Sequence, residues 1–208
     1  MQNDPNKNRA VLRGTVADDP YFSHRVHGID FYRLSLCVAR LSGREDRINV
    51  LIPYPLLEQT PLSPGLFVEV TGEIRSFNNR SGIGSRLVVT LYAKTISISE
   101  DEPCNTVFLS GTICKPPILR RTPLGRDICD LLLAVNRKYR RADYLPCIAW
   151  GSLAVLCAQL QVGDTVILEG RLQSRIYLKA MGEQFEEHTA FEISIMSLEA
   201  AGRSSCAM

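Results

Sequence analysis

Two stretches of this chain repeat one another, and the repeat limits the possible folds more than any other feature of the sequence. Residues 10–40 match residues 107–137, and after one inserted residue the match resumes with Gly72 over Gly170. Solenoid repeats have periods of about 20–50 residues, so a period of about 100 residues indicates a duplicated domain. A unit of about 100 residues can bury a core of its own. We therefore expect two similar domains, whose differences carry information about function.

The composition is typical of a soluble globular protein. Hydrophobic residues make up 45% of the chain and charged residues 22%. No apolar run approaches the ~18 residues of a membrane span, and the first six residues hold no apolar segment of a secretory signal. We expect a cytoplasmic protein that does not contact membranes. The net charge of +2 does not by itself indicate a nucleic-acid partner, so the positions of the cations matter more.

Neither the cysteines nor the histidines form a motif of known chemistry. The seven cysteines include no CxxC pair, so we expect reduced thiols and no metal site. His24, His27 and His188 lack metal-ligand or nucleophile spacing, and the first two fall where we expect exposed turn residues. The Gly-Ile-Gly at 82–84 lacks the Lys-Ser/Thr of a phosphate loop. We expect no catalysis, no cofactor and no small-molecule substrate.

The second copy gives the clearer secondary-structure pattern. Period-two alternation and β-branched residues predict five strands, and helical spacing predicts one helix with Ser152 as a candidate cap. Gly111 is interpreted as a bulge that bends the first strand. A polar loop is expected at 177–187. The predicted strands are 106–113, 127–135, 144–150, 165–175 and 189–198, and the predicted helix is 151–160.

Five strands with a short helix between the third and fourth follow the order of an OB barrel. The sequence therefore predicts an all-β protein of two tandem OB-fold, five-stranded barrels. In the first copy, four prolines within residues 53–64 allow at most one helical turn, so its helix is expected to be degenerate. The expected domains are 1–100 and 106–199, with a short linker at 101–105 that keeps the barrels close and a disordered tail at 200–208.

The basic loop of the second copy is the strongest functional signal. Residues 137–144 place four cations around Tyr139, and Tyr144 follows. Single-stranded nucleic acid is bound by cations that follow the phosphates and by rings on which unstacked bases lie. The alternative is a solvated hairpin tip whose charges serve solubility.

The third strand strengthens this interpretation. Side chains alternate across a strand, so Tyr144 and Trp150 share one face while Leu145, Cys147 and Ala149 share the other. The small apolar set suits a barrel interior, which leaves two large rings facing outward. The alternative is that Trp150 packs under the following helix or in a subunit interface.

Two segments of the second copy resemble the bacterial single-stranded DNA-binding protein family. They are Cys-Ile-Ala-Trp-Gly-Ser-Leu-Ala at 147–154 and Glu-Gly-Arg-Leu-Gln-Ser-Arg-Ile-Tyr at 169–177. The resemblance covers about residues 106–199 and extends more faintly over 9–99. It implies that bases stack on four aromatics, three of which are tyrosine here although tryptophan is frequent in the family. They are Tyr139, Tyr144, Trp150 and Tyr177.

The same resemblance assigns phosphate contacts to the basic residues around those rings. Two further arginines of the second copy, Arg120 and Arg121, are expected to join them. The loop between Tyr139 and Tyr144 is short for the family. The cations that the resemblance implies are Arg137, Lys138, Arg140, Arg141, Arg171 and Arg175.

The first copy lacks this aromatic set. When the copies are aligned, Tyr139 and Tyr144 fall on Ser42 and Asp46, and Trp150 falls on Ile52, so we expect an aromatic-poor domain. It has instead a basic segment at residues 72–86. There Phe77 is a candidate stacking ring, and Arg75, Arg80 and Arg86 are candidate phosphate contacts. The alternative is an ordinary glycine-rich hairpin turn.

The function predicted from these residues is binding of single-stranded DNA with little sequence specificity, in replication, recombination or repair. The family presents four barrels per functional unit, so we expect a homodimer, with the exposed edges of the first strands as its surface. The family's acidic tail has no counterpart in residues 202–208, so we expect no recruitment of replication proteins through it. A protein-interaction scaffold and a single-stranded RNA binder remain alternatives.

Overall fold

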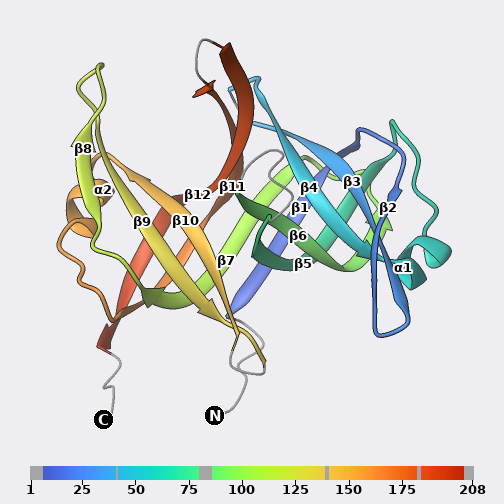
Figure 1. Ribbon diagram of the computed structural model, residues 1–208, viewed down its shortest axis with the longest axis horizontal. Coiled ribbons are helices and arrows are strands. Elements are labelled where there is room, and N and C mark those ends of the chain that lie inside the picture. Colours follow the sequence, from blue (N-terminus) through green and yellow to red (C-terminus); the bar gives the residue numbers. More distant parts are fainter. Residues whose placement is uncertain (1–6, 41, 80–85, 139–140, 182–183, 204–208) are drawn as a thin grey trace.

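Two β-barrels stand side by side in the computed structural model (Figure 1), which describes residues 7–40, 42–79, 86–138, 141–181 and 184–203. The twelve strands of these residues belong to one continuous sheet, which curls into a barrel at each end. The first half of the chain forms one barrel and the second half forms the other.

Within the described residues, the first barrel contains six strands and one helix. The sheet order is β2-β3-β4-β6-β5-β1, and β1 also pairs with β3, which closes the barrel. The elements are β1 (Asn8–Val16), β2 (Tyr21–Val26), β3 (Ile29–Ala39), β4 (Glu45–Pro53), α1 (Tyr54–Gln59), β5 (Phe67–Asn78) and β6 (Leu87–Ile98).

The second barrel repeats this order as β7-β11-β12-β10-β9-β8, with β7 pairing β9 at the closure. The predicted all-β fold of two tandem OB barrels is confirmed. The elements are β7 (Cys104–Ile113), β8 (Ile118–Arg121), β9 (Asp127–Asn136), β10 (Ala142–Trp150), α2 (Ser152–Cys157), β11 (Asp164–Met181) and β12 (Gln184–Arg203).

The strands differ from the sequence predictions in three places. Each barrel has an additional short strand, β2 or β8, and all four residues of β8 are exposed, so no apolar alternation marks it. Of the predicted loop at 177–187, residues 177–181 and 184–187 are paired strand residues of β11 and β12, so the loop predicted there is wrong for them. Strand β12 continues to Arg203, so the disorder predicted from residue 200 is wrong for 200–203, and residues 204–208 lie outside the described residues.

The two helices are equally long, although the prolines of the first copy led us to expect a shorter helix there. Both α1 and α2 have six residues, because Pro55 lies in the first turn of α1, where its missing N–H is harmless. Ser152 is not a side-chain cap, since Gly151 occupies the N-cap position of α2. No helix in the described part of the chain is long and apolar enough to cross a membrane.

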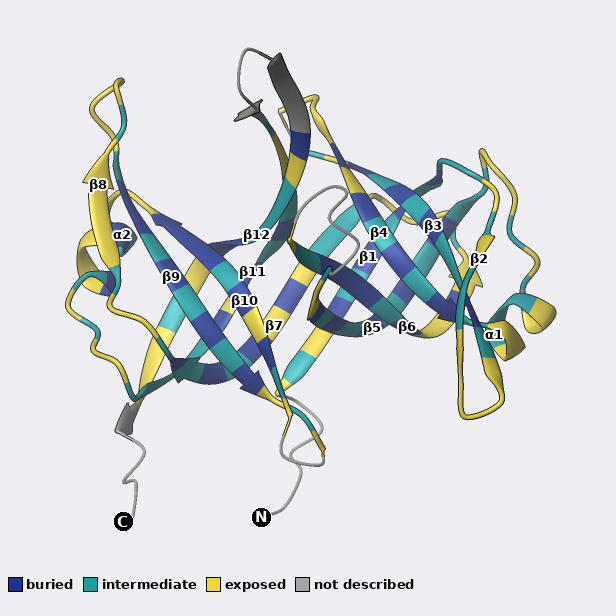
Figure 2. Ribbon diagram, viewed as in Figure 1, coloured by how far each residue is buried: buried dark blue, intermediate teal, exposed yellow. Residues whose placement is uncertain are grey.

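The core of each barrel consists of the inward-facing side chains of its strands. On β9, Leu131, Leu133 and Val135 are buried, and their neighbours in the chain are more exposed, so burial alternates along the strand (Figure 2). This alternation explains why the sequence pattern located the strands of the second copy.

Glycines allow the strands to cross closely where each barrel closes. A Cβ atom on Gly111 would lie 2.7 Å from the carbonyl oxygen of Ala134, and one on Gly14 would lie 2.3 Å from that of Cys37. The β7–β11 register runs through Gly111 without a shift, so the bulge predicted there is wrong. The register shifts lie instead in the β11–β12 pair, opposite Thr165/Val166 and Glu169/Gly170, where β12 has one additional residue each time.

The first strands of the two barrels pair with each other. Strand β1 runs antiparallel to β7, with Ala10 opposite Val107, which is its own counterpart in the repeat. The two halves are therefore related by an approximate twofold axis at this pair. The edges of the two first strands are paired with each other within the chain, so the prediction that they form an exposed dimer surface is wrong.

Candidate nucleic-acid interface

The outer face of the second barrel carries two exposed rings on one strand. Trp150 is 44% exposed and Tyr144 is 51% exposed, whereas Leu145, Cys147 and Ala149 on the opposite face of β10 are buried. This is the predicted division of faces. The two rings lie six residues apart, so about 20 Å of strand separates them.

Trp150 stands in a row of side chains that crosses three strands. It pairs with Ile128 on β9, and Ile128 pairs with Arg120 on β8, so the three residues share the outer face. Arg120 donates to Asp130, with Nε 2.5 Å and Nη2 3.1 Å from the carboxylate oxygens. This ion pair places a guanidinium on the ring-bearing face and neutralises part of its charge.

Trp150 also lines a shallow depression of about 540 Å³ at the edge of α2. The ring is not covered by the helix, which decides against the alternative that it packs beneath it. The depression is open to solvent and brings a ring together with polar and charged groups. Its lining residues are Gly125, Arg126, Asp127, Trp150, Gly151, Ser152 and Val155.

The β11–β12 hairpin carries a third ring. Tyr177 lies against His188, with ring centroids 5.7 Å apart, and the guanidinium of Arg175 lies 5.8 Å from the Tyr177 ring. Arg175 also lies 4.0 Å from Glu192. Burial raises the pKa of Glu192, while Arg175 opposes that rise. The carboxyl is therefore less easily ionised in the folded protein.

Two of the predicted phosphate contacts lie at the boundary between the barrels. Arg137 makes a bidentate ion pair with Asp143 and also donates to the carbonyl oxygen of Ser76 at 3.0 Å. Arg75 donates to Asp143 at 3.1 Å and to Glu73. The Arg75–Asp143 ion pair and the Arg137–Ser76 hydrogen bond join the two barrels, so both guanidiniums already have partners within the protein.

The remaining predicted cations lie on the surface or partly buried in it. Arg121 pairs with Asp127 at 3.0 Å. Lys138, Arg141, Arg175 and Arg86 are exposed, and Arg171 is half-buried. Three predicted site residues, Tyr139, Arg140 and Arg80, lie outside the described residues.

The junction between the barrels was not predicted from the sequence. Asp143 accepts a hydrogen bond from the Ser76 amide of the first barrel at 2.5 Å. Across the approximate twofold axis, Asp46 of the first barrel pairs with Arg40 and accepts from the Ser174 amide of the second barrel at 2.8 Å. Figure 1 shows the β11–β12 hairpin that carries Ser174 beside the end of β4. The chain offers a signal for this junction, since Arg40 and Asp46 repeat as Arg137 and Asp143.

The structure corrects the alignment of the two copies by one residue. Val38 pairs with Asp46, and Val135 pairs with Asp143, so Asp46 corresponds to Asp143 and not to Tyr144. Along the same strands, Arg47 corresponds to Tyr144. The inserted residue lies after β10, in the helical connection.

The far end of the same strands gives the same correction. Phe31 pairs with Pro53, and Ile128 pairs with Trp150, so Pro53 rather than Ile52 takes the place of Trp150. The first barrel therefore has an arginine and a proline where the second has its two exposed rings.

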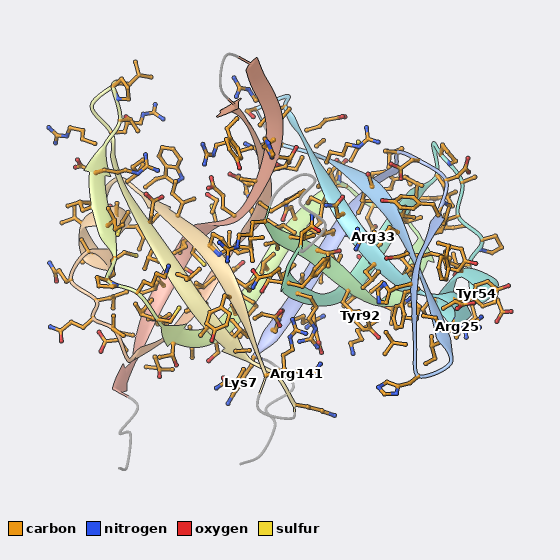
Figure 3. All side chains as sticks on the ribbon, in the orientation of Figure 1. Lys7, Arg25, Arg33, Tyr54, Tyr92 and Arg141 are labelled. Atoms are coloured by element: carbon orange, nitrogen blue, oxygen red, sulfur yellow. The ribbon has the colours of Figure 1, made fainter. Side chains whose placement is uncertain are left out.

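The sequence comparison predicted a first barrel poor in aromatics, but the barrel has several aromatic side chains at other positions. His24 is stacked on Phe31, with centroids 5.1 Å apart, and is not a turn residue, whereas His27 is exposed at positive φ in the adjacent turn. Lys94 lies 4.8 Å from the Tyr92 ring. Figure 3 shows Arg33 and Tyr92 on this barrel, with Tyr54 near its end distant from the second barrel.

Phe77 is the exposed ring on the β5–β6 hairpin. It is 39% exposed, and the guanidinium of Arg33 lies 5.5 Å from its centroid. The sequence does not reveal the role of Arg33, because Arg33 lies on β3, far from Phe77 in the chain. Only the curvature of the barrel brings the two side chains together.

The thiols do not form a reactive or metal-binding group in the described part of the chain, where no metal-ligand cluster occurs. Burial raises the pKa of Cys147 and raises that of Cys157 to about 11. Both thiols therefore stay protonated near neutral pH, and protonated thiols are poor nucleophiles and poor metal ligands.

Comparison with known proteins gives a consistent match for the second barrel. Residues 104–200 match the Single-strand binding protein family. Single-stranded DNA-binding protein A of Bacillus subtilis is 37% identical over 87 residues, which are 38% of this chain and 51% of that protein. The single-stranded DNA-binding protein of Halalkalibacterium halodurans is 32% identical over 108 residues, which are 49% of this chain and 64% of that protein. The chain thus spans about half the length of these relatives.

The likeness of the whole fold extends further. The wild-type single-stranded DNA binding protein from Thermus aquaticus aligns with a TM-score of 0.75 over 97% of this chain and 96% of that chain. Their sequence identity is 24%, so this likeness concerns the fold. It includes both barrels, whereas the family match covers the second barrel alone.

Proposed function

We propose that this chain binds single-stranded DNA with little sequence specificity, because its second barrel matches the single-strand binding protein family. The observation that carries the proposal is the exposure of Tyr144 and Trp150 on the outer face of β10, whose other face is buried. Large rings left in solvent provide flat surfaces on which unstacked bases of any identity can lie.

Binding combines stacking with phosphate contacts. Tyr144, Trp150 and Tyr177 supply the stacking surfaces on the second barrel, together with Tyr139, whose placement is not described. Arg175, Lys138 and Arg141 are exposed cations suited to phosphates. Because Arg120 and Arg121 already pair with Asp130 and Asp127, their charges are partly neutralised, and stacking supplies the larger share of the affinity.

The first barrel contributes a smaller surface. Phe77 with Arg33 offers one ring and one guanidinium, and Arg86 lies exposed at the start of β6. We propose that these residues extend the contact with the strand beyond the second barrel. The role in the cell that fits this activity is protection of single strands during replication, recombination or repair in the cytoplasm, without catalysis.

Two chains would supply the four barrels that the resemblance implies, and we propose a homodimer. Since the first-strand edges are paired within the chain, the contact requires another surface. The outer face of β1 and β7 carries a depression of about 310 Å³ lined by Arg9, Val11, Thr106 and Phe108. Arg9 and Thr106 are counterparts in the repeat, as are Val11 and Phe108. A patch with such internal twofold symmetry suits an isologous contact with a second copy.

A titration with oligo-dT at two salt concentrations tests the proposed function. Trp150 is the only tryptophan, so its fluorescence should fall as bases stack on it, and the affinity should drop with salt as counterions are released. Unchanged emission together with no salt-dependent binding by anisotropy would favour a protein-interaction scaffold. Equal or tighter binding of oligo-rU would favour RNA as the ligand.

Light scattering tests the assembly. We expect a dimer at micromolar concentration, and the variant Phe108→Asp should shift it toward the monomer of 23.2 kDa. A monomeric wild-type protein would contradict the homodimer but would leave the binding proposal untouched.

A further inference from the structure

We infer that the two barrels share one DNA-binding site at their junction, in which Phe77 of the first barrel and Tyr144 of the second contact the same short stretch of single-stranded DNA. Ser76 and Asp143 are the positioning residues of this junction. The inference rests on the proposed function and adds to it a binding site assembled from residues of both barrels.

The first support is the direct connection between the strand of Tyr144 and the strand of Phe77. The Tyr144 amide donates to Ser76 Oγ at 2.8 Å, and Phe77 follows Ser76 in the chain. Bond lengths along this path hold the Cα atoms of Phe77 and Tyr144 within about 11 Å of each other. Two rings at this separation can hold neighbouring nucleotides of one single strand.

The second support is the charge cluster that fixes this connection. Asp143 is fully buried, and its carboxylate is shared by Arg137 of its own barrel and by Arg75 and the Ser76 amide of the first barrel. A buried carboxylate with charge-assisted hydrogen bonds from both sides fixes the orientation of the groups around it. Asp143 directly precedes Tyr144, and Ser76 directly precedes Phe77, so the cluster sets the positions of both ring-bearing residues.

The third support is the contrast with the other half of the junction. There the Arg47 amide donates to Ser174 Oγ at 3.2 Å, the counterpart of the Tyr144–Ser76 bond. Arg47 corresponds to Tyr144, and Arg175, which follows Ser174, corresponds to Phe77. One half of the junction thus carries two rings and the other carries two guanidiniums. The ring pair suits bases, and the guanidinium pair suits phosphates.

A double-mutant cycle on oligo-dT affinity tests the shared site. Phe77→Ala and Tyr144→Ala should each weaken binding, by up to about tenfold. The double variant should lose less than the product of the two losses, because a strand released by one ring is no longer held against the other. The control pair is Phe77→Ala with Trp150→Ala, whose rings serve different stretches, so their losses should multiply. Both rings are exposed, so the variants should keep the wild-type melting temperature.

A second cycle tests the positioning role of Ser76. Ser76→Ala should weaken binding in the wild-type background and weaken it by a smaller factor in the Tyr144→Ala background, where only the position of Phe77 is still affected. Ser174→Ala is the matched control, and its effect should persist when Tyr144 is absent. Losses that multiply for Phe77 and Tyr144, or a Ser76→Ala loss that is undiminished in the Tyr144→Ala background, would overturn the shared site while single-stranded DNA binding stands. A wild-type protein that does not bind oligo-dT would instead contradict the proposed function itself.

Discussion

The two barrels have the same strand order and the same register, yet they carry different chemistry at matching positions. The second barrel has Tyr144 and Trp150 on its outer strand, where the first has Arg47 and Pro53. Conversely, the β5–β6 hairpin carries Phe77 where the β11–β12 hairpin carries Arg175. Repetition of the backbone therefore conserves the architecture and the junction, while the ligand-facing side chains have diverged. If the proposed function holds, we expect the second barrel to supply most of the stacking.

The largest expected effect concerns the two buried carboxylates of the junction. Asp143 neutralises two guanidiniums, Arg137 and Arg75, whereas Asp46 neutralises Arg40. Removing one partner of a buried ion pair costs about 3–5 kcal/mol, because the remaining charge is left uncompensated. We expect Asp143→Ala to lower the free energy of unfolding by that amount in urea denaturation. Asp46→Ala should lower the free energy of unfolding by less. An equal loss for the two variants would show that the second guanidinium at Asp143, that of Arg75, adds nothing to stability.

The next effect compares the rings of the second barrel with the cation that replaces one of them. Stacking is worth about 1–3 kcal/mol per base, so Tyr144→Ala should weaken oligo-dT binding about tenfold with little change in salt dependence. Arg47→Ala, at the matching position, should weaken binding less and should flatten the salt dependence. Anisotropy titrations at several salt concentrations separate the two behaviours. A larger loss of oligo-dT affinity for Arg47→Ala than for Tyr144→Ala would show that the first barrel, not the second, makes the main contacts with DNA.

A smaller effect separates exposed cations from those held in the junction. Arg175 is exposed beside Tyr177, so Arg175→Gln should reduce the slope of log affinity against log salt by about 0.7, the value for one phosphate contact on a single strand. Arg75→Gln should leave that slope unchanged and lower the melting temperature instead, because Arg75 is paired with Asp143. A changed slope for Arg75→Gln would return it to the phosphate contacts.

The sequence predicted much of this structure because its signals are local. Alternation along β9 and β10 located the strands and assigned Tyr144 and Trp150 to the outer face. Strand β8 was missed because none of its residues is buried, and the extended hairpin was missed because polar residues at 177–187 do not alternate visibly. The position of the inserted residue could not be fixed, because only strand pairing shows that Pro53 takes the place of Trp150.

The site was less predictable than the fold, because its electrostatics depend on contacts between the barrels. In the sequence, Arg75 and Arg137 are indistinguishable from phosphate-binding arginines. Only the packing of the two barrels brings Arg75 to Asp143 and Arg137 to Ser76. The pair of Arg33 with Phe77 was likewise hidden, since the two residues lie on different strands. The pairing of β1 with β7 could not be predicted from the sequence of either strand. The unpaired edge of a strand can pair equally well with a strand of the same chain or of another chain.

The smallest expected effect concerns Glu192, which puts a partly buried carboxyl on the ring-bearing face where the first barrel has Thr90. Burial raises the folded-state pKa of Glu192 above its ordinary value of 4.5, so the folded protein holds this proton more tightly than the unfolded chain does. The resulting stability is complete below pH 4.5 and is lost as the pH rises through the raised pKa.

Glu192→Gln removes this loss, so the variant should be more stable than the wild type at pH 7, and the difference should shrink in mild acid. It should also bind oligo-dT about two- to threefold more tightly at low salt, because a negative charge beside Arg175 disappears. Glu199→Gln, an exposed position on the same strand, is the control for the change in net charge. If both variants gain the same affinity, Glu192 acts only through net charge and does not lie along the path of the DNA. If Glu192→Gln alone gains affinity, the path runs over β12 between Tyr177 and Trp150, on the barrel that carries the rings.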